Sequence, residues 1–151
     1  MCLIGVAAVT RQLDMALAMF IQFTAYLRPG ELIALTGDRL ISPHAQGVTP
    51  FWALLLSPQE EMVAGKTGEF DESVLLDAPV LISLHSQLQT LKARAKFGHL
   101  WSFSYADYLR TFHNLVELSN LEVLAPYPYS LRHGGASHDS LTKRLTFSQI
   151  K

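Results

Sequence analysis

Two segments of the sequence carry side chains that are suited to binding a phosphate group. Residues 25–32 (AYLRPGEL) place Arg28 at the predicted entry of a helix, and residues 129–137 (YSLRHGGAS) place Arg132 directly before His133. A guanidinium group stays charged and offers planar, bidentate donation to phosphate oxygens. The two glycines that follow His133 leave room for close backbone approach. Side chains of these types suit phosphate binding if the fold brings the two segments together.

A lysine in a predicted hairpin is the third candidate. Residues 65–68 (GKTG) place Lys66 two residues before a second glycine, where it is suited to entering a groove. The alternative is a solvated lysine, because Gly-Lys-Thr-Gly is also ordinary turn chemistry. The segment is not a P-loop, since that motif needs a glycine at position 60, and the chain has Glu60 there.

In this order and spacing, the three segments resemble the catalytic domain of tyrosine recombinases of the phage-integrase type. Those domains carry an arginine in a "GLRxGEL" segment, then a hairpin lysine, then an "HxLRH" box, and the similarity runs from about residue 8 to residue 141. The resemblance implies a mainly helical fold with a small antiparallel β-sheet (α+β). It also implies DNA as the partner and DNA recombination or integration as the function, in a relic or fragment of a mobile element.

The resemblance assigns roles in DNA breaking and rejoining, which proceeds through a covalent 3′-phosphotyrosine without a metal ion or other cofactor. Arg28 and Arg132 match the arginines that stabilise the charge developing on the phosphate oxygens. Lys66 matches the general acid that delivers a proton to the departing 5′-oxygen. Members of the family act as multimers, often by exchanging a C-terminal helix that this sequence lacks, so a homo-oligomer stays open as a partner besides DNA.

Three neighbouring positions complete this implied site. Glu31 matches the acidic residue that orients the first arginine without touching substrate, and His133 is placed in the same supporting role. Tyr129 stands where the family usually has histidine. A phenol still donates a hydrogen bond to phosphate, but it is a poorer base near neutral pH. The alternative for Tyr129 is a half-buried aromatic side chain.

The sequence also departs from the family pattern. No tyrosine follows Tyr129, and the second Gly-His or Gly-Trp motif is missing, so the domain is predicted to be truncated before its nucleophile and inactive in cleavage alone. The stretch before Met15 is too short for the helical DNA-clamping domain of the family. Two alternatives stay open: a non-catalytic DNA-binding or interaction module, and a fragment without function.

Simpler interpretations compete with the phosphate site. Arg28 can be an exposed charge at a helix entry, and Arg132 with His133 can be a surface pair. A metal site formed by His133, His138 and Asp139 is not predicted, because the cysteine partners and second ligand pair of common sites are absent.

The elements that must position these residues follow from hydrophobic periodicity and from breakers. The chain is predicted as one partial domain over residues 1–151, with helices, then a small sheet, then helices. Helices are predicted over residues 13–26, 30–37, 79–91 and 105–118 and from residue 129 onward, and strands over residues 51–57, 61–66 and 73–77.

Composition sets the remaining bounds. Hydrophobic residues make up 49% and charged residues 17% of the chain, which is globular rather than disordered, and the net charge of −1 gives no overall argument for nucleic acid. Residues 1–91 hold four basic and nine acidic residues, whereas residues 92–151 hold eight basic and four acidic ones. The single Cys2 and an apolar opening too short for a membrane span predict an intracellular protein, nuclear in a eukaryote and otherwise cytoplasmic, without membrane association.

Overall fold

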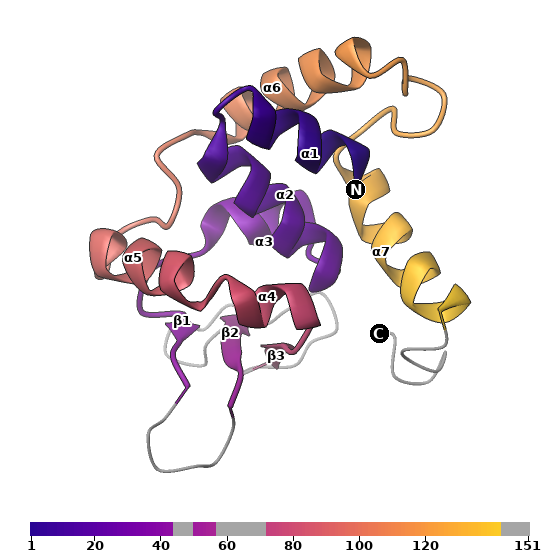
Figure 1. Ribbon diagram of the computed structural model, residues 1–151. Helices are drawn as coiled ribbons and strands as arrows, with labels where there is room; N and C mark the ends of the chain where they lie inside the picture. Colours follow the sequence, from indigo (N-terminus) through magenta and orange to yellow (C-terminus); the bar gives the residue numbers. More distant parts are fainter. Residues whose placement is uncertain (44–49, 57–71, 143–151) are drawn as a thin grey trace. The chain divides into compact units, whose positions relative to one another are not determined.

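A computed structural model describes residues 1–43, 50–56 and 72–142 of the chain (Figure 1). Its elements follow the order α1 (Cys2–Val9), α2 (Leu13–Thr24), α3 (Pro29–Ala34), β1 (Leu40–Ile41), β2 (Trp52–Leu56), β3 (Glu72–Leu76), α4 (Pro79–Ser83), α5 (His85–Ala95), α6 (Tyr105–Leu118) and α7 (Tyr129–Leu141). The chain forms two compact units: a helical unit of residues 1–33 and 101–151, and a sheet unit of residues 34–100. The mainly helical α+β class is thereby confirmed, while a single recombinase-type domain stays a prediction.

The helical unit has an apolar core built around α2. This helix packs against α1 and α7, and α1 also packs against α6. Most of α2 is buried because its apolar residues leave few polar positions, and α6 contributes a strongly amphipathic face. The completely buried core side chains of these helices include Ala7, Ala18, Met19, Ile21, Tyr108, Phe112 and Leu115.

The boundaries of α6 agree with the prediction of a helix over residues 105–118 because local signals fix its start. The Ser104 hydroxyl accepts a hydrogen bond from the Asp107 backbone N–H, and the Asp107 carboxylate accepts one from the Ser104 backbone N–H. This reciprocal pair is a capping box, which satisfies donors that the first turn leaves open. The hydrogen bonds from Ser104 hold the pKa of Asp107 below its ordinary value.

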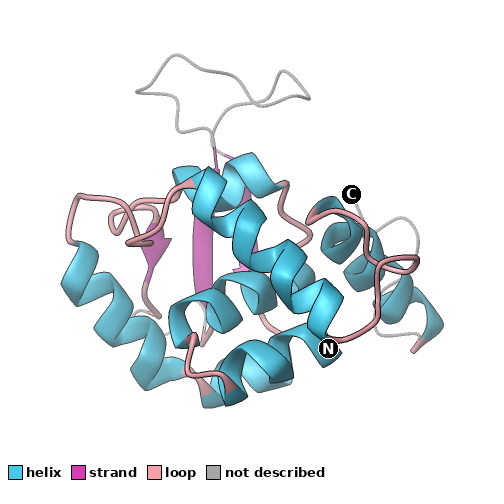
Figure 2. Cartoon of the chain, turned by 90° about the horizontal axis from the view of Figure 1, so that it is seen from above, coloured by secondary structure: helices cyan, strands magenta, loops and turns pink. Residues whose placement is uncertain are grey.

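The sheet unit contains a three-stranded antiparallel sheet in the order β1-β2-β3 (Figure 2). The register pairs Leu40 with Leu54 and Trp52 with Leu76. Along β2 the residues Trp52, Leu54 and Leu56 are buried and alternate with half-buried ones, so one face of the strand meets the core. The Lys92 ammonium of α5 donates to the carbonyls of Gly37, at 2.9 Å, and Leu40, so it ties this helix to the turn before β1.

Several predicted boundaries need correction. The strands predicted over residues 51–57 and 73–77 occupy residues 52–56 and 72–76. The sequence did not predict β1 or α1. The strand predicted over residues 61–66 lies outside the described residues. The helix predicted over residues 79–91 is two helices, because the backbone of Leu84 (φ −94°, ψ 17°) leaves the helical region between them. The helix predicted over residues 30–37 spans Pro29–Ala34, so it does not extend to Gly37. A Cβ at Gly37 would lie 2.2 Å from the Lys96 carbonyl oxygen, so this glycine permits close backbone contact.

Candidate functional site

The turn between α2 and α3 has an unusual backbone. The helix predicted through residue 26 ends at Thr24, because Tyr26 adopts a φ of 52°, a conformation that aromatic residues rarely take. Two contacts with α7 hold Tyr26 there. Its carbonyl oxygen accepts a hydrogen bond from the Arg132 guanidinium, and its hydroxyl donates to the Asp139 carboxylate. Tyr26 is one of four described non-glycine residues with a positive φ, the others being Arg11, Lys96 and Asn120, and it is the one that contacts a predicted site residue.

Arg28 follows directly after this turn and is held by Glu31. The guanidinium forms an ion pair with the Glu31 carboxylate, whose other oxygen accepts from the Arg28 backbone N–H at 2.6 Å. The hydrogen bond with Glu31 raises the pKa of Arg28, burial opposes the rise, and the nearby Tyr129 hydroxyl adds to it. The Arg28 side chain is 30% exposed, yet its Nε is buried and finds no hydrogen-bond partner among the described residues.

The first two turns of α7 carry the other predicted residues. Tyr129 is the first residue of the helix. Its side chain is 41% exposed, which is more than the half-buried alternative predicted. Arg132 lies one turn further on the same side and is half-buried. The ring of His133 packs edge-on against the ring of Tyr129, with 4.9 Å between ring centroids.

The two glycines of α7 differ in what they contact. A Cβ at Gly135 would lie 1.8 Å from the Phe23 carbonyl oxygen and 3.1 Å from a ring carbon of Tyr26, whereas a Cβ at Gly134 would meet only the Phe23 ring at 3.4 Å. The close backbone approach predicted from these glycines is therefore made at Gly135, and its partner in the structure is α2. It brings α7 close enough for Arg132 to reach the turn.

The structure thus brings Arg28 and Arg132 to one junction of the helical unit. The Tyr129 hydroxyl near Arg28 belongs to the helical turn before Arg132, and the carbonyl that Arg132 contacts lies two residues before Arg28. A guanidinium has five N–H donors, so the contact with Tyr26 does not saturate Arg132. Lys66, the third predicted residue, lies outside the described residues.

Three residues that build this junction were not predicted from the sequence: Gln22, Tyr26 and Asp139. Asp139 had been considered only as a metal ligand, whereas it accepts a hydrogen bond from Tyr26. Gln22 is completely buried and hydrogen-bonds to the backbone on both sides of the junction. A lone glutamine within the apolar run of α2 was a usable signal, since buried polar groups require partners. Tyr26 gave none, because its positive φ depends on contacts with α7.

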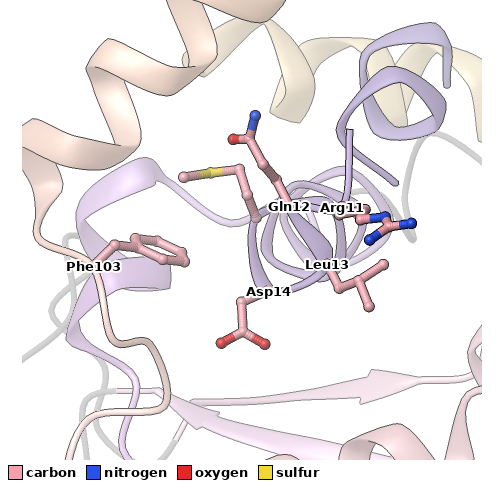
Figure 3. Close-up of a pocket in the computed structure, with 6 residues that line it drawn as sticks. Arg11, Gln12, Leu13, Asp14 and Phe103 are labelled. Carbon is pink, nitrogen blue, oxygen red and sulfur yellow. The ribbon is translucent and has the colours of Figure 1, made fainter. Parts of the chain in front are cut away.

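The helical unit also has a shallow hollow of about 400 Å³ that is separate from the junction (Figure 3). It is lined by Arg11, Gln12, Leu13, Asp14, Met15 and Phe103. Figure 3 shows Arg11 and Asp14 pointing apart rather than converging. The hollow therefore offers no arrangement of polar groups that would fix the orientation of a ligand.

The described ranges contain neither a cluster of metal ligands nor a helix that could span a membrane. No group of three or more His, Cys, Asp or Glu side chains in residues 1–43, 50–56 and 72–142 is arranged to hold a metal ion. Over the same ranges, every helix is too short or too polar to cross a membrane.

Comparisons of the chain with protein-family models, with curated proteins and with solved structures give no match.

Proposed function

We propose that this chain binds the DNA backbone in the manner of a tyrosine-recombinase catalytic domain, with Arg28 and Arg132 holding one phosphate. The observation that carries the proposal is a pair of contacts at the junction of the α2–α3 turn and α7. Arg132 donates to the Tyr26 carbonyl, two residues before Arg28, and Tyr129 of the same helix lies near Arg28, although 103 residues stand between the two arginines in the sequence. A phosphate diester that lies between the two guanidinium groups would neutralise charge on both and match their donor geometry.

Neighbouring residues receive supporting roles in this proposal. Glu31 holds Arg28 in place before DNA arrives, and its contacts with the Arg28 backbone N–H and guanidinium support that role. Tyr129 donates from the start of α7, and His133 keeps its ring oriented. Lys66 lies outside the described residues, and its role as proton donor is proposed from the resemblance alone.

The proposed activity is DNA binding within a recombination or integration reaction, without strand cleavage by this chain alone. The five tyrosines are Tyr26, Tyr105, Tyr108, Tyr127 and Tyr129, and none follows the arginine box. Incubation with a suicide substrate, a DNA duplex nicked beside the scissile phosphate, is expected to give no covalent protein–DNA adduct on a denaturing gel. An adduct would contradict this part of the proposal. The alternative is a non-catalytic DNA-binding module. In that case the chain binds DNA but takes no part in a recombination reaction.

The binding itself is tested by fluorescence anisotropy with a labelled duplex over a series of salt concentrations. The logarithm of the affinity is expected to fall linearly with the logarithm of the salt concentration, by about 0.9 for each phosphate that is neutralised. Because Arg28 and Arg132 share one phosphate, the variant R28Q/R132Q is expected to lower this slope by about one phosphate, not two. The exposed Arg110 of α6 supplies the matched control R110Q. Binding that is independent of salt, or equal in wild type and R28Q/R132Q, would overturn the proposal.

A further inference from the structure

The side chain of Gln22 on α2 is completely buried within the described core. Its amide Nε2 donates to the carbonyl oxygens of Leu27 and Pro128, each at 3.2 Å, and its Oε1 accepts a hydrogen bond from the Tyr108 hydroxyl. An amide nitrogen has two hydrogens, so both donors are used. One side chain therefore joins α2, the α2–α3 turn, the start of α7 and α6.

The two carbonyl groups that Gln22 binds stand directly before the predicted site residues. Leu27 precedes Arg28, and Pro128 precedes Tyr129, the first residue of the helix that carries Arg132. The backbone N–H of Leu27 also donates to the Gln22 carbonyl at 3.2 Å, which closes the turn directly before Arg28. One amide group thus links the two segments, in addition to the contacts of Arg132 and Asp139 with Tyr26.

Tyr108 determines which way this amide points. Its hydroxyl donates to Oε1, which leaves Nε2 facing the two carbonyl groups. Burial raises the pKa of Tyr108 far above its ordinary value, so the hydroxyl keeps its proton and remains a donor. A glutamate at position 22 would have nearly the same shape, but it would turn a carboxylate oxygen without a hydrogen toward two carbonyl oxygens.

We propose that Gln22 is a positioning residue that sets the distance between Arg28 and the Tyr129–Arg132 turn, with Tyr108 fixing its orientation. The effect on DNA binding rests on the proposed function, whereas the effect on the geometry of the arginines does not. The two effects can therefore be measured separately.

The experiment compares wild type with Q22E, Y108F and M19A. Met19 is a completely buried residue of α2 that contacts the core without hydrogen bonds, so M19A is a control for lost packing. Three quantities are measured for each protein: unfolding by urea, the guanidinium ¹H–¹⁵N signals of Arg28 and Arg132, and DNA affinity at fixed salt. The arginine signals are assigned with R28K and R132K.

We expect Q22E and Y108F to shift both guanidinium signals and Q22E to weaken DNA binding about tenfold, which corresponds to the loss of one well-placed charged contact. M19A is expected to lower the free energy of unfolding. The positions of both guanidinium signals should stay at their wild-type values, and the DNA affinity should stay within about twofold of wild type. If Q22E does not fold, Y108F decides, because it removes one oxygen atom and leaves the ring in the core.

Each remaining outcome supports or overturns the proposal. Unchanged guanidinium signals in a folded Q22E or Y108F would overturn it, as would shifts of equal size in M19A. Wild-type protein that binds no DNA, combined with shifted signals in Q22E, would remove the proposed function and retain the positioning role of Gln22. Full DNA affinity in a folded Q22E with shifted guanidinium signals would overturn the effect on DNA binding and retain the positioning role of Gln22.

Discussion

Replacing Gly135 with alanine tests whether the close contact between α7 and α2 builds the junction. The added Cβ would lie 1.8 Å from the Phe23 carbonyl oxygen and 2.9 Å from its carbon, and backbone atoms cannot move aside as a flexible side chain can. We therefore expect α7 to move away from α2. This movement would also stretch the hydrogen bonds that Tyr26 makes with Arg132 and Asp139.

The expected cost follows from three contributions. Overpacking costs about 1–3 kcal/mol, and weakening two hydrogen bonds costs about 1 kcal/mol each. The higher helix propensity of alanine returns about 1 kcal/mol. The free energy of unfolding should then fall by about 2–4 kcal/mol, a large part of the 5–15 kcal/mol typical of small domains.

Gly134 supplies the matched control, since it is the adjacent residue of the same helix. A Cβ there would meet only the Phe23 ring at 3.4 Å, which is an ordinary contact. G134A should therefore be as stable as wild type or up to about 1 kcal/mol more stable through helix propensity. Urea unfolding followed by far-UV circular dichroism measures both variants. If G135A unfolds at the same urea concentration as G134A, the close contact described for α7 is wrong.

Two further predictions concern single hydrogen bonds. Ser104→Ala removes the cap of α6 and should lower the free energy of unfolding by about 1 kcal/mol. Because the pKa of Asp107 is lowered in the folded state, the capping box should stabilise fully above the ordinary aspartate pKa of about 3.9 and lose its effect as the pH falls further, so S104A should be less sensitive to acid over that range. Equal acid sensitivity of the two proteins in urea titrations would contradict this. Tyr26→Phe removes the contact with Asp139 and should cost about 1–2 kcal/mol in the same assay, whereas the exposed Tyr105→Phe on α6 should cost less than about 0.5 kcal/mol.

Local signals explain which elements could be predicted. The bounds of α6 follow from Ser104, Asp107 and an amphipathic pattern, all of which lie within the helix or next to it. The two residues of β1 were missed because so short a strand is defined by its partner β2, not by its own sequence. The break at Leu84 was missed because its neighbours Leu81, Leu88 and Leu91 keep one apolar face across it.

The candidate site was predictable in its residue types and not in its geometry. Arg28 and Arg132 were chosen from their local segments, and Glu31 from its position three residues after Arg28, which suits the ion pair that forms. The left-handed turn at Tyr26 was not predictable, because its backbone is held by Arg132 and Asp139 from a distant part of the chain. Long-range contacts of this kind leave no pattern in a single sequence.

The most direct test of the shared phosphate is a double-mutant cycle in DNA affinity with R28Q, R132Q and R28Q/R132Q at one low salt concentration. Two arginines on the same phosphate depend on each other, so we expect each single variant to weaken binding about tenfold and the double variant to weaken it by much less than a hundredfold, a coupling of about 1 kcal/mol or more. Losses that multiply to the full hundredfold would mean that the two side chains act on separate sites, and unchanged affinity in all three variants would mean that neither arginine binds DNA.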